Sequence, residues 1–277
     1  MINQTSLKLS IITINFNNAI GLRKTIESVA AQTSRDFEYI VIDGGSVDSS
    51  IEVIKEYDEK ITFWVSESDK GIYHAMNKGI NVAKGKFCHF LNSGDWLVDS
   101  LVVENMLNSL SDSDILLGNE IFINAKGKKR LHKSNSEIGL YTFYRSTLFH
   151  ASAYIRRSLF DQYGLYDESL KIVSDWKWYL IVAGLHKANI KIVDINVCYF
   201  DSTGISSINQ ELDQTERRKV LEELVPAPIL HDYDKYSFDI EQMTRIKKHP
   251  ILYRIFWIIE RVLFKFEKWD LGRKRQF

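Results

Sequence analysis

The sequence has few cysteines and no long apolar run, and both absences narrow the classes of protein to consider. Among its 277 residues only Cys88 and Cys198 are cysteines, and each lies within an apolar stretch and not in a spaced pair. This placement favours two buried reduced thiols over a disulfide, a metal site or a redox centre. Residues 1–8 lack the basic start and apolar core of a secretory signal, and no apolar segment reaches the length of a transmembrane helix. We therefore expect a cytoplasmic protein that is neither secreted nor membrane-spanning.

The chain also lacks net charge, because 36 lysines and arginines balance 36 aspartates and glutamates. The balance is uneven along the chain: residues 245–277 hold ten basic and three acidic side chains, so they carry +7 and residues 1–244 carry −7. An acidic main body argues against nucleic acid as a partner, and the basic end is a candidate for an anionic surface. The content of 45% hydrophobic and 26% charged residues predicts a chain that folds throughout.

A glycine-rich phosphate loop is missing as well. After the first apolar run the chain reads Asn15-Phe-Asn-Asn-Ala. This stretch has neither the Gly-x-Gly-x-x-Gly of a dinucleotide oxidoreductase nor the glycine-rich basic loop of a sugar nucleotidyltransferase. The oxidoreductase class is therefore disfavoured, and a sugar nucleotidyltransferase is a weak alternative.

The sequence does contain a regular alternation of apolar runs and amphipathic segments. Strands that alternate with helices of 10 to 15 residues imply right-handed crossovers and a mostly parallel sheet covered by helices on both faces. We therefore predict an α/β fold. The predicted strands are residues 9–15, 37–43, 61–65, 87–91 and 114–123, and the predicted helices are residues 20–32, 47–57, 72–83 and 97–110.

Polar residues follow four successive predicted strands where the strands end, and three of these ends carry acids. In such sheets ligands bind beyond the carboxyl ends of the strands. Carboxylates in a row repel one another and destabilise the fold unless a cation neutralises them. Oxygen ligands of this kind suit Mg²⁺ or Mn²⁺, which can also hold a phosphate. The four ends are Asn15-Phe-Asn-Asn, Asp43-Gly-Gly-Ser-Val-Asp, Ser66-Glu-Ser-Asp-Lys-Gly and Asn92-Ser-Gly-Asp.

Five segments, in this order, resemble the inverting family 2 glycosyltransferases of the GT-A fold, in the branch that makes bacterial exopolysaccharides and capsules. They are residues 10–17, 42–48, 68–79, 90–95 and 173–176. The resemblance implies a GT-A domain over residues 1–205, with the Rossmann-like sheet of nucleotide-diphospho-sugar transferases. A helical extension over residues 206–277 would follow it.

The resemblance also implies an activity. A sugar would pass with inversion from a nucleotide diphosphate sugar, UDP-linked first of all, to a glycan or lipid-linked acceptor in cell-surface polysaccharide biosynthesis. The metal-binding element of the family contains only one acidic residue here, Asp95. A nucleotide-sugar-binding protein with weak or no turnover is therefore an alternative.

The resemblance assigns roles to individual residues. Asp43 would bind the nucleotide base, since a pyrimidine offers an N–H donor to a carboxylate. Asp95 would hold the Mn²⁺ or Mg²⁺ that bridges the diphosphate, and Asp175 would be the catalytic base that takes the proton of the acceptor hydroxyl. The other implied residues are Thr13, Asn15, Asp69 and Asn92 on the donor side and His150 and Trp176 on the acceptor side.

Each of these assignments has a plainer alternative. An acid after a strand or at the start of a helix is ordinary turn and capping chemistry, and large aromatic residues at helical spacing more often belong to the core. His74 lies where the resembling segment leads us to expect an acid, and the sequence offers no physical reason for it. The plainer interpretations apply to Asp43, Asp69, Asp95, Asp175, His150 and Trp176.

Residues 249–268 form a separate predicted helix. Pro250 suits its first turn. An apolar face beside basic residues fits a helix lying in a membrane interface, and it fits equally a helix packed on the catalytic domain or on a partner subunit. The apolar stripe is Leu252, Ile255, Ile259, Val262 and Phe266, and its basic neighbours are Arg254, Arg261, Lys265 and Lys268.

Overall fold

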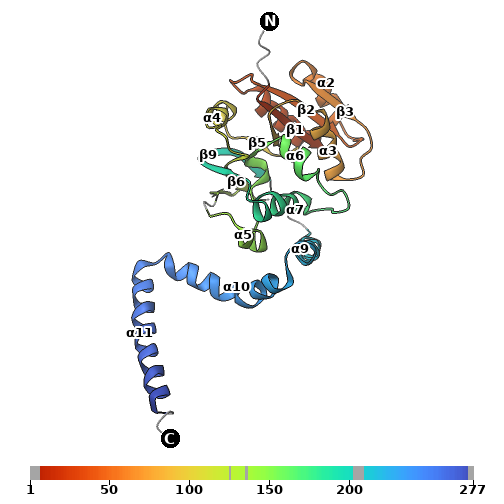
Figure 1. Ribbon diagram of the computed structural model, residues 1–277. Coiled ribbons are helices and arrows are strands. Elements are labelled where there is room, and N and C mark those ends of the chain that lie inside the picture. Colours follow the sequence, from red (N-terminus) through yellow and green to blue (C-terminus); the bar gives the residue numbers. More distant parts are fainter. Residues whose placement is uncertain (1–6, 125, 135–136, 202–208, 274–277) are drawn as a thin grey trace. The chain divides into compact units, whose positions relative to one another are not determined.

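The computed structural model describes residues 7–124, 126–134, 137–201 and 209–273, and the side chains as far as residue 265 (Figure 1). The chain divides into two compact units, Met1–Val220 and Leu221–Phe277. The boundary predicted near residue 205 lies outside the described residues and stays a prediction. Within the part of the chain that the structure describes, no helix is long and apolar enough to cross a membrane.

The first half of the sheet is parallel. β1 lies between β2 and β4, and β3 pairs with the other side of β2. The register places Asn15 opposite Asp43 and Asp43 opposite Ser66, so three of the polar strand ends lie side by side. The bounds are β1 Leu9–Asn15, β2 Phe37–Asp43, β3 Phe63–Ser66 and β4 Phe87–Phe90.

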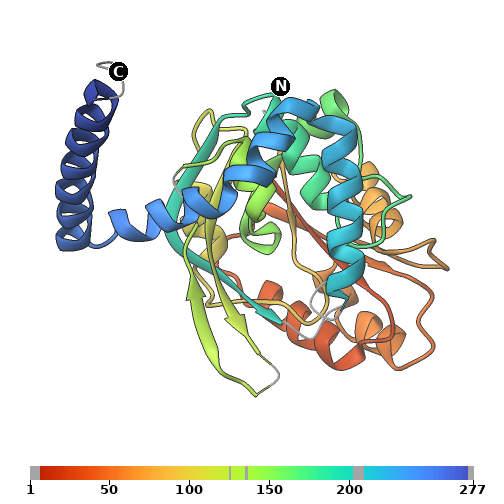
Figure 2. The same cartoon turned by 90° about the horizontal axis from the view of Figure 1, so that it is seen from below.

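The second half of the sheet mixes both directions. The strand order is β3-β2-β1-β4-β8-β6-β9-β5, and β7 pairs with β6. β6 and β9 are parallel, whereas the β4–β8, β6–β8, β6–β7 and β5–β9 pairs are antiparallel. Figure 2 shows the β6–β7 hairpin in yellow-green. The bounds are β5 Trp96–Leu97, β6 Ile115–Ile123, β7 Lys129–His132, β8 Ala153–Arg156 and β9 Ile190–Asp201.

Helices connect the strands, as the sequence predicts, but two predicted helices are shorter than expected. The helix predicted over residues 47–57 extends only over Ser50–Glu56. Residues 97–110 were expected to be helical throughout, whereas Leu97 pairs with Cys198 of β9 and the helix α4 begins at Val102. The Asp99 carboxylate accepts a hydrogen bond from the Leu101 backbone N–H and so shapes the turn before the helix. The early helices are α1 Ala19–Ala30, α2 Ser50–Glu56, α3 Ile72–Val82 and α4 Val102–Asn108, and the 3₁₀ turn η1 is Asp58–Lys60.

The later helices carry the acceptor side of the predicted site and the C-terminal part of the chain. Helix α7 continues directly into the π-helix η3. Helix α9 contains the division between the two units, and α10 and α11 belong to the second unit. The bounds are α5 Leu140–Arg145, η2 His150–Ser152, α6 Ser158–Tyr163, α7 Ser174–Tyr179, η3 Leu180–Leu185, α9 Gln210–Leu224, α10 Ala227–Lys247 and α11 Pro250–Arg273.

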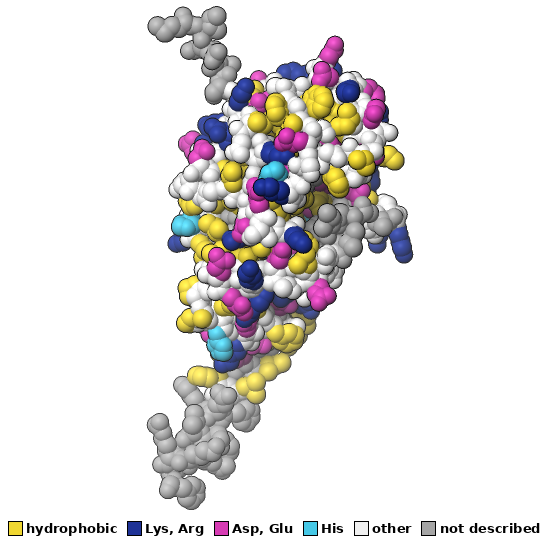
Figure 3. Space-filling view, turned by 90° about the vertical axis from the view of Figure 1, so that its right-hand side faces the viewer, with side chains coloured by type: hydrophobic (Ala, Val, Ile, Leu, Met, Phe, Trp, Pro, Cys, Tyr) yellow, Lys and Arg dark blue, Asp and Glu magenta, His cyan; other side chains and the backbone are white. Residues whose placement is uncertain are grey.

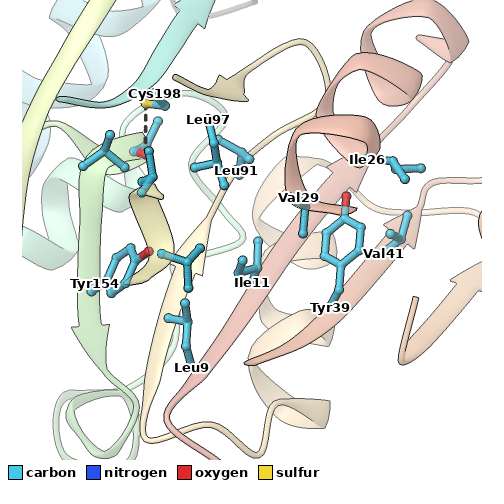
Figure 4. Packing of buried hydrophobic residues seen from close by; sticks show 14 of the residues in the cluster. Leu9, Ile11, Ile26, Val29, Tyr39, Val41, Leu91, Leu97, Tyr154 and Cys198 are labelled. Atoms are coloured by element: carbon cyan, nitrogen blue, oxygen red, sulfur yellow. Dashed lines mark hydrogen bonds between the residues drawn. The ribbon is translucent and has the colours of Figure 1, made fainter. Parts of the chain in front are cut away.

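The hydrophobic core lies against the sheet (Figure 4). Leu9 and Ile11 of β1 and Ile26 of α1 are fully buried, and burial of one such side chain stabilises the fold by about 1.5–3 kcal/mol. Cys88 and Cys198 are free and buried, as predicted. Burial raises the pKa of the Cys88 thiol to about 12, which keeps it protonated. This core fixes the strand ends that form the candidate site.

Candidate active site

Asp43 is fully buried at the end of β2, and its carboxylate organises the loop that follows. It accepts hydrogen bonds from Asn15 Nδ2 at 2.7 Å and from the hydroxyl groups of Ser46 and Ser66, each at 2.6 Å. The backbone N–H groups of Gly45 and Ser46 also donate to it. Burial opposes ionisation, but the hydrogen bonds outweigh it and the pKa of Asp43 lies below its usual value.

These five donors occupy both oxygens of Asp43. A hydrogen bond from a nucleotide base would therefore have to replace one of them. The predicted contact with the base stays a prediction. What the structure adds is a second role: Asp43 shapes the loop between β2 and α2.

This role predicts a pH-dependent stability. We expect Asp43→Asn to lower the free energy of unfolding by about 1–3 kcal/mol at neutral pH, measured by chemical denaturation. The pKa of Asp43 in the folded protein lies below its usual value of 3.8. The contribution of the ionised Asp43 to the free energy of unfolding is therefore complete above pH 3.8, and it is lost as the pH falls through the pKa of the folded protein. The two proteins should converge in acid, whereas the exposed Asp36→Asn control should change stability little at any pH. A constant difference down to low pH would contradict this account.

Thr13 and Asn15 lie on β1 and are buried. The Thr13 hydroxyl donates to the Leu91 carbonyl at 2.7 Å and lies 3.0 Å from the Tyr39 hydroxyl, so it links β1 to β2 and to the residue that follows β4. Asn15 Nδ2 donates to Asp43 and to Ser50, whereas Asn15 Oδ1 is buried and has no hydrogen-bond partner among the described residues. Both side chains therefore support the donor-side strand ends from within the sheet.

Asp69 lies in the loop before α3 and has two partners on that helix. Its Oδ1 accepts a hydrogen bond from Lys78 Nζ at 2.6 Å and lies 3.1 Å from His74 Nδ1, while Lys78 also pairs with Glu67. An acid at position 74 in this orientation would bring a second carboxylate against Asp69. The histidine that the sequence left unexplained thus fits a position that faces a carboxylate.

Gly44 lies close against the side chains of Asp69 and Phe16. A Cβ atom at Gly44 would lie 3.1 Å from Asp69 Oδ2 and 3.2 Å from Phe16 Cδ2, so these two side chains flank the glycine. Phe16 follows β1 and is 65% exposed. An exposed aromatic ring next to a carboxylate can stack on a nucleotide base while the carboxylate accepts an N–H. Sequence reasoning missed Phe16, although an aromatic residue between two asparagines after a strand was a signal.

Asp95 lies in the turn after β4, where its carboxylate is buried among other acids. Its Oδ1 accepts a hydrogen bond from the Asp201 backbone N–H at 2.9 Å. Burial raises the pKa of Asp95 well above its usual range, and the nearby carboxylates of Glu120 and Asp201 add to this effect. Burial likewise raises the pKa of Glu120 to about 7. Glu120, in the middle of β6, gave no signal in the sequence.

The residues around Asp95 fit a divalent cation that keeps other ligands. Asn92 Oδ1 is buried without a hydrogen-bond partner among the described residues, and an amide oxygen with a carboxylate is a ligand set that Mg²⁺ and Mn²⁺ accept. No group of three His, Cys, Asp or Glu residues in the described ranges is placed to hold a metal ion. Asp95 and Asn92 would hold such a cation, and water and a diphosphate would supply its remaining ligands.

A lysine lies near these acids. Lys24 of α1 places its Nζ 2.9 Å from the centroid of the Trp96 ring, which stacks on Tyr199 at 4.8 Å. Burial lowers the pKa of Lys24, and the Asp201 carboxylate opposes that shift. Lys24 is therefore a further candidate for a diphosphate contact that sequence reasoning missed.

Asp175 lies in the first turn of α7 beside a buried tyrosine of α3. The Tyr73 hydroxyl donates to Asp175 Oδ1 at 2.8 Å and also contacts the Ile172 carbonyl oxygen. Burial raises the pKa of Tyr73 well above its usual range, and the charge of Asp175 adds to the shift. Asp175 therefore has a fixed orientation, which a general base requires.

The two predicted acceptor residues have different surroundings. His150 Nε2 lies 2.9 Å from the Tyr166 hydroxyl, and the ring stacks on Phe90. Burial lowers the pKa of His150 and the Asp175 charge opposes this shift, so the structure brings His150 and Asp175 into one neighbourhood. Trp176 is only 1% exposed, and its Nε1 donates to the carbonyls of residues 143 and 146. Such burial favours the plainer interpretation of Trp176 as a core residue, and its acceptor role stays untested.

Comparison with known proteins identifies the family. Residues 10–167 match the family model described as "Glycosyl transferase family 2". The chain belongs to glycosyltransferase family 2. It is 33% identical over 208 residues to the "Uncharacterized glycosyltransferase Rv1514c" of Mycobacterium tuberculosis, which covers 72% of this chain and 77% of that protein. It is 29% identical over 174 residues to a "PGL/p-HBAD biosynthesis glycosyltransferase" of Mycobacterium bovis, covering 60% of this chain and 66% of that protein.

Solved structures show the same fold. S. aureus TarS 1-349 in complex with UDP-GlcNAc matches with a TM-score of 0.57 at 19% identity, over 71% of this glycosyltransferase and 59% of that chain. The mannosyltransferase PcManGT from Pyrobaculum calidifontis, in complex with GDP-Man and Mn²⁺, matches with a TM-score of 0.58 at 15% identity, over 76% and 61% of the two chains. This glycosyltransferase therefore has the predicted GT-A fold, and it spans about 60% of the length of these two solved chains.

Proposed function

We propose that this glycosyltransferase moves a sugar from a nucleotide diphosphate sugar, with UDP-linked donors the first choice, to a hydroxyl group of a glycan or lipid-linked acceptor. The observation that carries the proposal is the row of polar strand ends on one sheet edge. There Asp69 and Phe16 flank Gly44, and a buried acid, Asp95, follows β4. The relatives' names support a role in cell-surface polysaccharide or glycolipid biosynthesis, because one of them acts in PGL/p-HBAD biosynthesis.

Each group has a separate task in the proposed reaction. Phe16 and Asp69 bind and orient the nucleotide base, while Asn92, Asp95 and Lys24 face the diphosphate. A divalent cation, when bound, offsets the charge of the departing nucleoside diphosphate. Asp175 takes the proton of the acceptor hydroxyl as its oxygen bonds to the anomeric carbon and the bond to the donor phosphate breaks. A single displacement of this kind inverts the anomeric configuration.

A binding protein without turnover is the alternative, since Asp95 lacks neighbouring acids within its own turn. The two functions differ in one measurement. A transferase releases nucleoside diphosphate from a sugar nucleotide over many turnovers, whereas a binding protein is stabilised by the sugar nucleotide and leaves it intact.

Figure 3 shows acidic and basic side chains interspersed over one face, with no large basic patch in view that would suit nucleic acid.

The base-stacking role of Phe16 predicts a loss of affinity without a loss of stability. We expect Phe16→Ala to weaken binding of the recognised nucleoside diphosphate, tested first with UDP, by roughly 10- to 100-fold in calorimetry, because stacking on an aromatic ring contributes that much. Melting temperature without ligand should stay unchanged, since the ring is exposed. The matched control is Ile20→Ala, an apolar residue of α1 that is 89% exposed. Equal affinity of Phe16→Ala and wild type would remove Phe16 from the donor site.

We further propose that α11 attaches the protein to an anionic lipid bilayer at the inner face of the cell membrane. At 100° per residue, Arg254, Arg261 and Lys265 fall within about 40° of the helix circumference. Beside them runs an exposed apolar arc that contains Ile251, Ile255, Ile258 and Val262. Cations next to an apolar face match the charge and the depth of an anionic bilayer surface. Phe266 of the predicted stripe and its predicted basic neighbour Lys268 lie outside the described side chains.

This attachment predicts a charge-dependent pelleting. The full chain should pellet with vesicles that contain phosphatidylglycerol and should stay in solution with neutral phosphatidylcholine vesicles. Reversing Arg254, Arg261 and Lys265 to glutamate should reduce pelleting at least about tenfold, since each cation near the surface contributes about 1 kcal/mol. Reversal of three cations of the β6–β7 hairpin, Lys126, Lys128 and Arg130, is the matched control. Pelleting that survives the α11 reversal would overturn the proposal, and self-association of the vesicle-free protein through α11 would count against it.

A further inference from the structure

We propose that Tyr73 is a positioning residue for Asp175 whose hydroxyl group changes its partner when Asp175 takes up a proton. The inference rests on the proposed role of Asp175 as base and assigns the residue that holds it ready. Tyr73 comes from α3 and Asp175 from α7, 102 residues further along the chain. Nothing in the spacing of the sequence relates the two residues.

The Tyr73 hydroxyl has one hydrogen and two acceptors. Its oxygen lies 2.8 Å from Asp175 Oδ1 and also within hydrogen-bond contact of the Ile172 carbonyl oxygen. The tyrosine ring is buried, so its orientation is fixed by packing. The single hydroxyl hydrogen can be donated to the carboxylate or to the carbonyl. Which of the two accepts it depends on the charge of the carboxylate.

In both protonation states Asp175 then has the Tyr73 hydroxyl group as a hydrogen-bond partner. While Asp175 is ionised, the Tyr73 hydroxyl donates to it, because a charged acceptor forms the stronger hydrogen bond. After Asp175 has taken the proton of the acceptor hydroxyl, its own O–H donates to the Tyr73 oxygen, and the Tyr73 hydrogen turns to the Ile172 carbonyl. The transferred proton stays on Asp175. The Tyr73 proton never leaves its oxygen, in keeping with the raised pKa of that hydroxyl.

The Ile172 carbonyl is held in place for this exchange from a second side. The backbone N–H groups of Lys171 and Ile172 both donate to the Glu216 carboxylate of α9, at 2.8 and 3.0 Å. Glu216 therefore fixes Ile172 through its N–H in both protonation states of Asp175, and the Ile172 carbonyl accepts the Tyr73 hydrogen once Asp175 is protonated. The second acceptor of the Tyr73 hydroxyl is a rigid group and not a mobile loop carbonyl.

Helix α3 also holds the segment between α6 and α7 near its start, through Asn77, one helical turn after Tyr73. Asn77 Nδ2 donates to the Tyr166 carbonyl at 2.9 Å, and the Tyr166 N–H donates to Asn77 Oδ1 at 3.0 Å. Residues 73 and 77 are four apart, so they lie on the same face of α3. The helix begins three residues after Asp69, and Tyr73 thereby connects the donor-side loop with the base.

The direct test is the titration of the Asp175 carboxyl carbon by NMR in the full-length protein, with the signal assigned by its absence in Asp175→Asn. Tyr73→Phe should raise the pH midpoint of this titration, because the ionised form loses a charge-assisted hydrogen bond. 3-Fluorotyrosine at position 73 keeps the ring and donates more strongly, so it should lower the midpoint. Tyr154→Phe is the control, since it removes a buried hydroxyl that has no hydrogen-bond partner among the described residues.

An unchanged midpoint in folded Tyr73→Phe would overturn the inference, and if that variant does not fold, an unchanged midpoint with 3-fluorotyrosine would overturn it. The second readout is the release of nucleoside diphosphate from a sugar nucleotide. In Tyr73→Phe the acid limb of kcat should move to higher pH while the KM for the donor stays constant. Full turnover by Asp175→Asn would instead refute the base assignment, and the carboxyl titration separates that failure from a failure of the inference about Tyr73.

Discussion

Asp175→Asn is expected to reduce sugar transfer roughly 10³-fold, because an amide cannot take the proton of the acceptor hydroxyl and general-base catalysis contributes about 10²–10⁴. Asparagine has nearly the same shape and can still accept the hydrogen bond from Tyr73. Donor binding should therefore be unchanged. The measurement is the steady-state release of nucleoside diphosphate, with donor affinity determined in parallel by calorimetry.

The control for this variant is Asp161→Asn, which removes one negative charge from an exposed position of α6. It should leave both transfer and donor affinity as in wild type. Full transfer by Asp175→Asn would show that another group takes the proton, and His150 would be the next candidate because it shares the neighbourhood of Asp175. Loss of donor binding together with transfer would show that Asp175 belongs to the donor site.

Asp95→Asn is expected to abolish the effect of Mn²⁺ on nucleotide binding. At a hundredfold excess over the dissociation constant, a ligand stabilises the folded state by about 2.7 kcal/mol. This corresponds to a rise of roughly 5–10 °C in melting temperature for a domain of this size. Wild type should show such a rise with the recognised nucleoside diphosphate and Mn²⁺ together, whereas Asp95→Asn should show only the smaller effect of the nucleotide alone. Turnover should fall by at least about 10²-fold, since the leaving group loses its electrostatic stabilisation.

The matched control is Asp99→Asn, which removes an exposed acid four residues further on that only shapes the turn before α4. A Mn²⁺ effect that survives in Asp95→Asn would place the cation elsewhere. Glu120 is the residue to replace in that case, because its buried carboxylate lies near Asp95.

The part of the fold that the sequence predicts well is the parallel half of the sheet. The predicted strands 9–15 and 37–43 coincide with β1 and β2, because continuous β-branched runs buried on both faces leave little ambiguity. The second half was less predictable. β9 has no regular alternation of exposed and buried positions over its 12 residues. It pairs with both β5 and β6, and such pairings depend on partners that lie far away in the sequence.

The candidate site shows the same division. The polar strand ends were predictable, since the carboxyl edge of a parallel sheet collects whatever follows each strand. Contacts between elements were not: no sequence pattern reveals that Tyr73 reaches Asp175, or that Glu120 in the middle of β6 lies near Asp95. For Trp176 the sequence pattern is ambiguous. Its aromatic spacing suits a sugar-binding surface and a buried helix equally well, and in the structure Trp176 is buried.

A donor panel tests whether the strand-end row of Asn15, Asp43, Asp69 and Asp95 belongs to a sugar-nucleotide transferase. Full-length protein is incubated with Mn²⁺ and individual UDP-, GDP-, dTDP- and CMP-linked sugars, and melting temperature and nucleotide release are recorded. We expect one donor, UDP-linked first of all, to raise the melting temperature by several degrees, with turnover that Asp175→Asn abolishes. If no donor stabilises the protein and none releases its nucleotide, the protein is not a sugar-nucleotide transferase.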